Sequence, residues 1–200
     1  MSAPTHAPLC GVGIGASAGG WRALRTVIAA LPADLRAAVF IVLHLDPRAR
    51  SLLPSLVAAA TALRVRDVRD ESLVETATMY VAVPDRHLVV LEGRVRLSLS
   101  EPVHYVRPAV DCLFESVARS WQTAAVGVVL TGTGGDGAAG IATIKRAGGF
   151  TIAQDPSDAE FASMPRAAIA TGFVDSVLPL GAIAAAITRA VAVAAAGRVA

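Results

Sequence analysis

The chain has 200 residues, of which 54% are hydrophobic and 17% are charged, and its formal net charge is +2. This apolar balance excludes an intrinsically disordered chain, because it supplies enough apolar surface to offset the entropy lost on ordering. The small net charge and an aromatic content of 4% give no reason to expect a nucleic-acid partner. The length is that of one α/β domain.

Composition also bears on the compartment. Residues 1–8 lack the basic and apolar segments of a secretion signal. The longest apolar stretch, residues 177–199, contains Arg189, so a buried amphipathic helix explains it better than a membrane span of about 20 uncharged residues. Cys10 and Cys112 lie in apolar runs and are expected to be buried thiols. We therefore expect a cytoplasmic protein that is not an integral membrane protein.

The hydrophobic pattern predicts alternating strands and helices. An apolar run at residues 9–14 predicts a first strand, and apolar residues three and four positions apart in residues 21–31 predict a helix. The first half continues with a strand at residues 38–45, a helix at 51–60, a strand at 79–83, and a β-hairpin formed by residues 87–91 and 95–99.

The second half repeats this alternation. Pro108 opens a helix with apolar residues on one face as far as Trp121. The remaining predicted elements are a strand at residues 124–130, a glycine-rich loop at 131–137, a helix to Arg146, strands at 150–153 and 173–177, and a last helix beginning near Pro179.

Alternating strands and helices, with strands that are apolar on both faces, predict a parallel sheet covered by helices on both sides. We therefore expect the α/β class: a three-layer α/β/α sandwich with a mostly parallel, doubly wound sheet and the antiparallel hairpin at one edge. Residues 1–8 are expected to be a flexible tail and residues 9–200 a single domain. We expect a monomer.

Three polar residues follow strands that this fold would place side by side. In an open α/β sheet the ligand site lies beyond the carboxyl ends of the strands. Ser17 follows the first strand, His44 the second, and Asp136 the strand at residues 124–130. Ser17 would be the nucleophile, His44 its general base, and Asp136 the group that orients the imidazole.

Ser17 lies in Gly15-Ala16-Ser17-Ala18-Gly19, a G-x-S-x-G sequence between a strand and a helix. Small neighbours allow a sharp turn that exposes the hydroxyl, and the free N–H of Ala18 could stabilise an oxyanion. Two other interpretations remain open. Ser17 could simply cap the helix, and Gly13-x-Gly15-x-x-Ala18 fits a loose dinucleotide-binding pattern.

His44 and Asp136 also have alternative interpretations. His44 could be a core histidine bonded to backbone, and Asp136 could cap the following helix or be a solvated turn residue. His44-x-Asp46 offers two metal ligands, but a third at matching spacing is missing, so we expect no metal. His87 is expected on the surface, whereas His104 could line a site.

Several blocks together resemble the catalytic domain of the chemotaxis protein-glutamate methylesterases of the CheB type. The resemblance covers residues 9–180 approximately. The matching blocks are residues 13–20 (GIGASAGG), 42–47 (VLHLDP), 79–87 (MYVAVPDRH), 107–117 (RPAVDCLFESV), 129–140 (VLTGTGGDGAAG), 151–155 (TIAQD) and 164–166 (MPR).

The resemblance implies a serine hydrolase that removes methyl esters from glutamates on the cytoplasmic helices of chemoreceptors, and that in many members also deamidates glutamines. It implies the triad Ser17, His44 and Asp136, with oxyanion or substrate contacts from Ala18, Thr133 and Gly134, and no metal or organic cofactor. Ala18 and Thr133 stand where the family usually has threonine and methionine. The family's usual receiver domain is not expected in this chain.

Those two departures leave a second hypothesis open, a catalytically decayed scaffold or binding module of the same fold. A third hypothesis is a nucleotide-binding α/β domain that uses the two glycine-rich loops.

Overall fold

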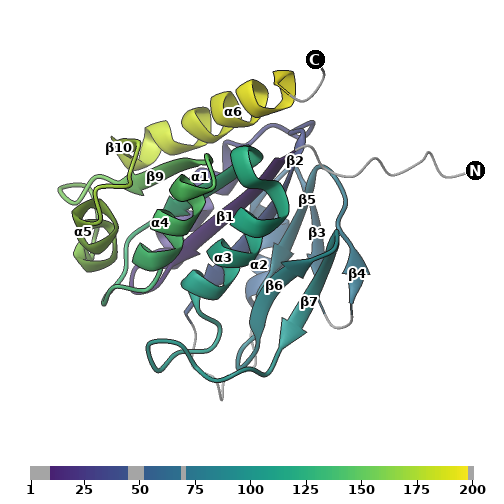
Figure 1. The fold of residues 1–200 in the computed structure, drawn as a ribbon, viewed down its shortest axis with the longest axis horizontal. Helices are drawn as coiled ribbons and strands as arrows, with labels where there is room; N and C mark the ends of the chain where they lie inside the picture. Colours follow the sequence, from purple (N-terminus) through teal and green to yellow (C-terminus); the bar gives the residue numbers. More distant parts are fainter. Residues whose placement is uncertain (1–9, 45–51, 69–70, 198–200) are drawn as a thin grey trace, which may run out of the picture.

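A computed structural model describes residues 10–44, 52–68 and 71–197 (Figure 1). Its centre is a seven-stranded sheet in the order β10-β9-β8-β1-β2-β5-β3, and every strand pair in it is parallel. The strands are β1 (Cys10–Ala16), β2 (Ala37–Leu43), β3 (Arg64–Asp67), β5 (Thr78–Val81), β8 (Ala125–Val129), β9 (Phe150–Gln154) and β10 (Ser176–Leu178). The predicted mostly parallel sheet is therefore confirmed.

Helices cover both faces of this sheet. One apolar core joins the sheet to α1 (Gly20–Ala29), α2 (Leu53–Ala60) and α6 (Leu180–Ala196). A second core joins its other face to α3 (Val110–Trp121), α4 (Ala138–Arg146) and α5 (Ser163–Ala170). Figure 1 shows α3 and α4 in front of the central strands. The three-layer α/β/α architecture predicted from the sequence is thus present.

The hairpin is antiparallel as predicted, but it belongs to a separate sheet. β6 (His87–Leu91) pairs with β7 (Arg94–Ser98), and β7 pairs with β4 (Ser72–Leu73). This small sheet packs its inner face, with Leu88, Val90 and Val95, into the core around α3. The hairpin therefore does not extend an edge of the central sheet.

Glycines in β1 allow α3 to lie against the strand. A Cβ atom on Gly11 would come within 2.2 Å of the Trp121 ring, and one on Gly15 within 2.3 Å of Val110 Cγ1. Gly13 faces Phe114 in the same way, at 2.8 Å. Side chains of α3 therefore fill the space beside the alternating glycines. This packing disfavours the dinucleotide interpretation, in which Gly13 and Gly15 would approach a pyrophosphate.

Four elements were not expected from the sequence, namely the edge strand β3, the short strand β4, the 3-10 helix at Gln122–Ala124 and helix α5. Within the described ranges, no helix combines the length and the apolar character that a membrane crossing requires. Cys10 is buried as expected, and Cys112 is half-buried. Residues 1–9, which include the expected tail, lie outside the described ranges.

Candidate functional site

Strand register brings Ser17 and His44 together. β1 lies between β2 and β8, and Ala16 is paired with Leu43 on β2. The next residues of these two strands, Ser17 and His44, therefore follow at adjacent strand ends, which are about 4.8 Å apart in a sheet. The His44 N–H donates to the Ala16 carbonyl at 3.1 Å.

The turn at Ser17 is fixed by backbone contacts. Ser17 N donates to Thr131 O at 3.0 Å, and Gly20 N donates to Ser17 O at 2.8 Å. The N-cap position of α1 is occupied by Gly19, with φ of 68°, and no side chain donates or accepts a capping hydrogen bond there. The interpretation of Ser17 as the helix cap is therefore wrong. A side chain on Gly20 would lie 2.5 Å from Leu43, so glycine lets the helix start close to the sheet.

His44 and Asp136 form the central contact of the site. His44 Nε2 lies 2.8 Å from Asp136 Oδ2, and only 3% of Asp136 is exposed. The same carboxylate accepts hydrogen bonds from the backbone N–H groups of Val110 at 2.6 Å and Asp111 at 3.0 Å. Asp136 therefore caps α3, whereas the predicted alternatives, a solvated turn residue or the cap of α4, are both wrong. The residue at the start of α4 is Gly137.

These contacts keep Asp136 ionised. Burial raises the pKa of Asp136, but hydrogen bonds from His44, Val110 and Asp111 lower it more, so that its pKa lies below the usual value. The amino-terminal end of α3 adds a favourable positive potential. An ionised Asp136 accepts a hydrogen bond from the Nε2–H of His44, which leaves Nδ1 of a neutral imidazole as the nitrogen able to take a proton.

The serine side of the arrangement is open. Within the described ranges, neither Ser17 Oγ nor His44 Nδ1 has a hydrogen-bond partner. Catalytic hydrogen bonds are often long in enzymes without substrate and close only in the complex. The structure thus shows His44 bonded to Asp136 at the strand end next to that of Ser17, whose hydroxyl has no partner among the described residues.

The loop after β8 packs directly on Ser17. A Cβ atom on Gly132 would lie 2.8 Å from Ser17 Cβ and 2.1 Å from Met164 Sδ, so this position has no room for a side chain. Thr131 Oγ1 donates to Ala18 O at 3.1 Å. Of the predicted oxyanion residues, Ala18 lies in this turn, and Thr133 and Gly134 follow Gly132 in the chain. The N–H groups of Ala18 and Thr133 donate no hydrogen bond within the described ranges.

A second His–Asp pair, His104 and Asp111, lies next to Asp136. Sequence reasoning considered His104 but missed Asp111. Asp111 accepts from His104 Nε2 at 3.0 Å and from Gly140 N at 2.7 Å. Burial raises the pKa of Asp111, against the hydrogen bond from Gly140, and the negative charge of Asp136 raises it further. The ligand atoms of His104, Asp111 and Asp136 lie within 4.8 Å of one another. Both carboxylates already accept hydrogen bonds from N–H donors, which leaves few lone pairs for an ion.

His87 differs from its expected position, and Cys112 is excluded as an alternative nucleophile. His87 is fully buried, which corrects its expected surface position. Its Nδ1 accepts from Ala109 N at 3.1 Å, and its Nε2 lies 3.1 Å from Glu101 O. Burial, together with Glu115 and Asp136, raises the pKa of Cys112 to about 11, so this thiol does not compete as a nucleophile. Asp46, the other half of the His44-x-Asp46 pattern, lies outside the described residues.

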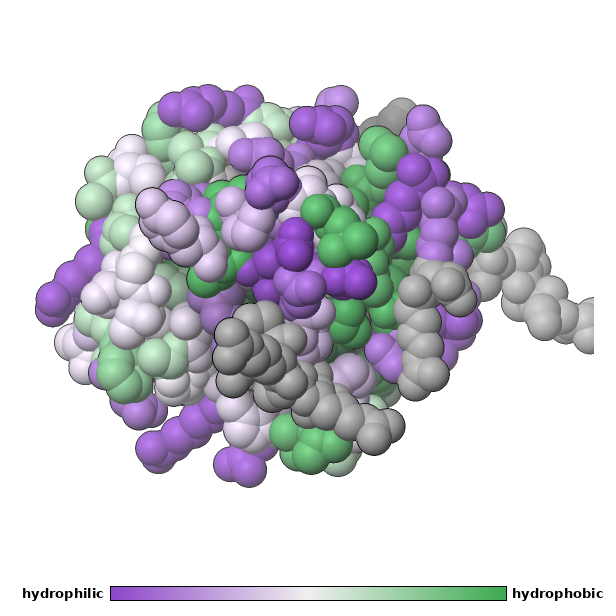
Figure 2. Space-filling view, turned by 90° about the horizontal axis from the view of Figure 1, so that it is seen from below, coloured by the Kyte–Doolittle hydropathy of each residue, from purple (hydrophilic) through white to green (hydrophobic). Residues whose placement is uncertain are grey.

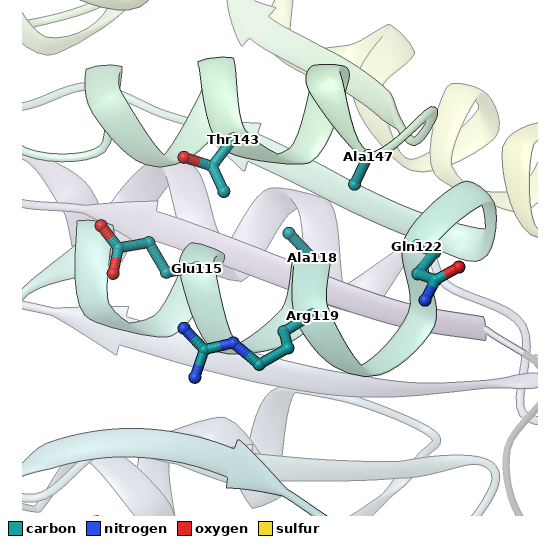
Figure 3. A pocket seen from close by; sticks show the side chains of 6 residues that line it. All are labelled: Glu115, Ala118, Arg119, Gln122, Thr143 and Ala147. Atoms are coloured by element: carbon teal, nitrogen blue, oxygen red, sulfur yellow. The ribbon is translucent and has the colours of Figure 1, made fainter.

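Two hollows differ in their relation to the site. A cavity of about 200 Å³ includes His44 among its lining residues. A larger groove of about 460 Å³ lies between α3 and α4 and is lined by Glu115 and Arg119 of α3 and by Thr143 of α4, among others (Figure 3). This groove contains none of the predicted site residues. Figure 2 views the molecule from the side on which the central strands end, where strongly hydrophilic residues gather at the centre beside hydrophobic ones.

A buried aspartate bonded to a histidine, beside a serine turn on a three-layer α/β fold, is the constellation of serine hydrolases. The family model described as CheB methylesterase matches residues 12–187. The chain belongs to this family.

Named relatives agree with this assignment. A Symbiobacterium thermophilum protein named protein-glutamate methylesterase/protein-glutamine glutaminase is 45% identical over 179 residues, which are 89% of this chain and 49% of that protein. A Leptospira interrogans relative is 35% identical over 86% of this chain and 89% of its own length. The chain thus spans about half the length of the first of these relatives and most of the second.

A solved structure agrees as well. The Thermotoga maritima CheB methylesterase catalytic domain superposes with a TM-score of 0.85 at 32% identity, covering 90% of this chain and 97% of that domain.

Proposed function

We propose that this chain is a serine esterase that hydrolyses the γ-methyl esters of glutamate residues in proteins. The observation that carries the proposal is the 2.8 Å contact between His44 and buried Asp136, beside the unengaged hydroxyl of Ser17. Membership in the CheB methylesterase family supports the choice of ester.

Acylation begins with attack of Ser17 Oγ on the ester carbonyl carbon. His44 Nδ1 takes the hydroxyl proton, and Asp136 stabilises the resulting imidazolium through Nε2. The tetrahedral intermediate then collapses, and the C–O bond to the methyl group's oxygen breaks. His44 returns the proton to this oxygen, so methanol leaves and the glutamyl group remains on Ser17.

In the proposed mechanism, backbone N–H groups stabilise the oxyanion. The N–H of Ala18 follows the nucleophile directly, and the Thr133–Gly134 segment supplies a second donor. Such donors contribute about 3 kcal/mol each to the barrier. Because backbone supplies them, alanine at position 18 and threonine at 133 keep both donors. The departures from the usual family residues therefore do not favour the decayed-scaffold hypothesis.

Deacylation uses the same groups in reverse. Water gives a proton to His44 as its oxygen attacks the acyl carbon. The bond from this carbon to Ser17 Oγ then breaks, His44 returns the proton to Ser17 Oγ, and a glutamate side chain is released. A glutamine side chain would follow the same path with ammonia as the leaving group. The relatives' name, which includes protein-glutamine glutaminase, supports this second reaction.

The proposed substrates are methylated cytoplasmic helices of chemoreceptors or a related methylated signalling protein, and the proposed setting is chemotaxis or related signal transduction in the cytoplasm. We propose a monomeric catalytic domain over residues 9–200 that needs neither a metal nor an organic cofactor.

The test is methanol release from receptor membranes carrying methyl-esterified glutamates. Ser17→Ala should abolish release, and a serine-directed phosphonate should label Ser17 in the wild type. Ser120→Ala is the matched control, because Ser120 lies near the far end of α3 and its hydroxyl bonds, among the described residues, only Val90 O. Full methanol release by Ser17→Ala, or stabilisation by NAD or ATP without any release, would show that the proposal is wrong.

A further inference from the structure

Two exposed aromatic side chains lie on opposite sides of the candidate triad. Among the exposed large hydrophobic residues of the described ranges, Tyr105 and Phe161 are the only aromatic ones. Tyr105 lines the cavity that includes His44. Phe161 borders the other flank, because its N–H donates to Thr131 Oγ1 at 2.8 Å and its carbonyl accepts from Gly132 N at 2.9 Å.

The position of β1 in the sheet places Ser17 between these two flanks. His44 follows β2 and Thr131 follows β8, and β1 pairs with both strands. Tyr105 therefore lies on the β2 side of Ser17, and the backbone of Phe161 lies on the β8 side.

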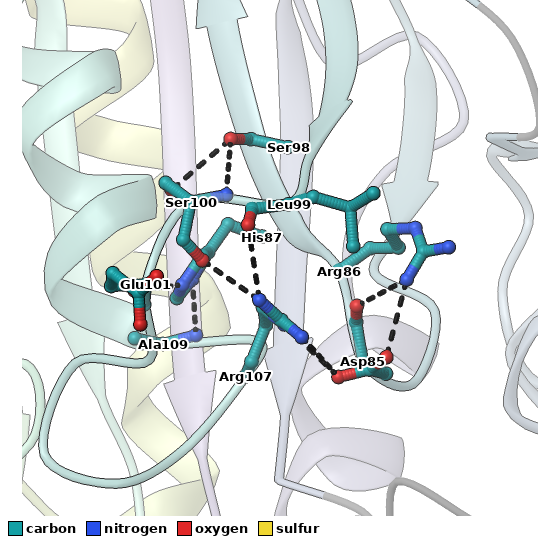
Figure 4. Close-up of polar contacts among 9 residues, drawn as sticks. All are labelled: Asp85, Arg86, His87, Ser98, Leu99, Ser100, Glu101, Arg107 and Ala109. Carbon is teal, nitrogen blue, oxygen red and sulfur yellow. Dashed lines mark hydrogen bonds and ion pairs between the residues drawn. The ribbon is translucent and has the colours of Figure 1, made fainter.

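Tyr105 belongs to the loop of residues 99–109 between β7 and α3, and polar contacts hold this loop in one shape (Figure 4). The Arg107 guanidinium donates to Asp85 Oδ1 through Nε at 3.0 Å and Nη2 at 2.7 Å. Its Nη1 donates to the carbonyls of Leu99 at 3.1 Å and Ser100 at 2.9 Å. One side chain thus ties the start of the loop, its end and the β5–β6 connection together.

Further contacts fix both the base and the tip of the loop. Buried His87 bridges Glu101 O and Ala109 N, which lie near the two ends of the loop. At the tip, Val103 and Val106 exchange backbone hydrogen bonds of 3.2 and 3.0 Å. An irregular segment of this length would otherwise sample many conformations, so these contacts remove most of its entropy before any partner binds.

The tip also carries backbone strain. His104 and Tyr105 have φ of 51° and 63°, two consecutive non-glycine residues in the left-handed region. Such conformations are strained and concentrate at ligand-binding and active sites. In exchange the ring of Tyr105 is held outward, with an exposed fraction of 102%.

Folding does not account for this arrangement. A single exposed hydrophobic side chain is ordinary on a protein surface. Here, however, a braced and strained loop holds an aromatic ring away from the core, at the mouth of the cavity that reaches the proposed base. Rigid, exposed aromatic rings are the residues that most often dominate the energy of protein–protein contacts.

We propose that Tyr105 and Phe161 determine specificity by gripping the protein substrate on the two sides of the esterified glutamate. The occupant is a folded protein surface whose apolar side chains flank the ester, because both rings are exposed and so are open to contact with a large partner. This inference rests on the proposed esterase function and adds the substrate contacts to it.

The experiment compares kcat/KM for a methyl-esterified receptor in membranes with kcat/KM for p-nitrophenyl acetate. Tyr105→Ala and Phe161→Ala should each lower the value for the receptor about tenfold, the ratio expected for an interface contact worth about 1.4 kcal/mol. Hydrolysis of p-nitrophenyl acetate should stay within twofold. Tyr105→Phe should retain receptor activity, since the ring makes the contact, and Val193→Ala serves as the control for loss of an exposed apolar side chain elsewhere.

The outcomes separate the two proposals. If the wild type hydrolyses both substrates and neither alanine variant changes the receptor value, the substrate contacts are wrong and the esterase function stands. If both substrates lose activity equally in the alanine variants, the rings act on the reacting centre and the specificity role is wrong. If the wild type releases no methanol from the receptor, the esterase function itself fails, and the substrate contacts fail with it.

Discussion

His44 and Asp136 are 92 positions apart in the chain, and their side chains are joined by a hydrogen bond of 2.8 Å. The same carboxylate holds the first two N–H groups of α3 through Val110 and Asp111. One buried charge therefore connects the end of β2, the loop after β8 and the start of α3. The orientation of the proposed base and the position of that helix depend on the same residue.

Asp136→Asn should lower both activity and stability. An amide cannot stabilise the imidazolium and favours the wrong tautomer, so we expect kcat for methanol release to fall roughly 10³- to 10⁴-fold. The amide also loses the charged cap of α3, which should cost about 1–2 kcal/mol of unfolding free energy. Single-turnover methanol release and urea denaturation measure the two effects separately.

Asp175→Asn is the matched control for this variant. Asp175 accepts hydrogen bonds from Lys145 and Thr151 at the opposite end of the sheet, so its loss should reduce stability and leave methanol release unchanged. If Asp136→Asn kept more than a tenth of the wild-type rate, Asp136 would not be the residue that orients the base.

The sequence predicted the edge of the sheet that carries the site. β1, β2 and β8 are continuous apolar runs, which identify buried parallel strands, and in such sheets the residues after the strands share one edge. Ser17, His44 and Asp136 could therefore be grouped without coordinates. The Ser17–His44–Asp136 assignment as a catalytic triad stays a prediction, although the His44–Asp136 contact agrees with it.

Features that depend on distant partners could not be predicted in this way. β3 has the sequence Arg-Val-Arg-Asp and lies at a sheet edge, so it lacks the apolar signal of a buried strand. His87 looks like a surface residue because its partners, Glu101 O and Ala109 N, are backbone atoms 14 and 22 positions away. Asp136 caps a helix that begins 26 positions before it, whereas sequence patterns of capping are local.

Gly15→Ala should disturb the site through the packing of β1 against α3. The added Cβ would lie 2.3 Å from Val110 Cγ1, in the first turn of the helix that Asp136 caps. Overpacking of this kind costs about 1–3 kcal/mol, and displacement of α3 should also lower the rate of methanol release. Denaturation and activity assays on the purified variant check both effects.

A second substitution distinguishes this clash from a general glycine effect. Val110→Ala should restore part of the stability in the Gly15→Ala background, because it removes the two methyl groups that the new Cβ meets. Gly181→Ala is the control, since nothing lies within 4 Å of a Cβ there and the residue is in α6. This control should be neutral or stabilise the protein by up to about 1 kcal/mol. Strictly additive effects of Gly15→Ala and Val110→Ala would contradict the proposed clash.

Asp175 should make stability depend on pH. Burial raises the pKa of Asp175, but hydrogen bonds from Lys145 and Thr151 lower it more, so that the folded-state pKa lies below the usual value. The stability that this gives is fully present above the unfolded-state pKa of about 3.9 and is lost as the pH falls through the folded-state pKa. Urea denaturation of wild type and Asp175→Asn at pH 7, 5, 4 and 3 measures it.

We expect the wild type to exceed Asp175→Asn by about 1–3 kcal/mol at pH 7 and pH 5, and by progressively less at pH 4 and pH 3. Other ionised carboxylates remain in both proteins, so their effects cancel in the difference. A difference that stayed constant down to pH 3 would mean that the ionised form of Asp175 is not preferentially stabilised in the folded protein.

The backbone at Thr133 is the last point at which the proposed mechanism can be tested. Thr133 is exposed and its N–H donates no hydrogen bond within the described ranges, so its side chain can be changed without disturbing the core. Thr133→Ala keeps the N–H and should leave kcat within about threefold, whereas Thr133→Pro removes a single oxyanion donor and should lower kcat roughly 10²- to 10³-fold. Both variants should show the wild-type melting temperature, and a serine-directed phosphonate should still label Ser17 in both. Equal activity of the proline and alanine variants would remove position 133 from the oxyanion site and leave the Ala18 N–H as the remaining proposed donor at the nucleophile turn.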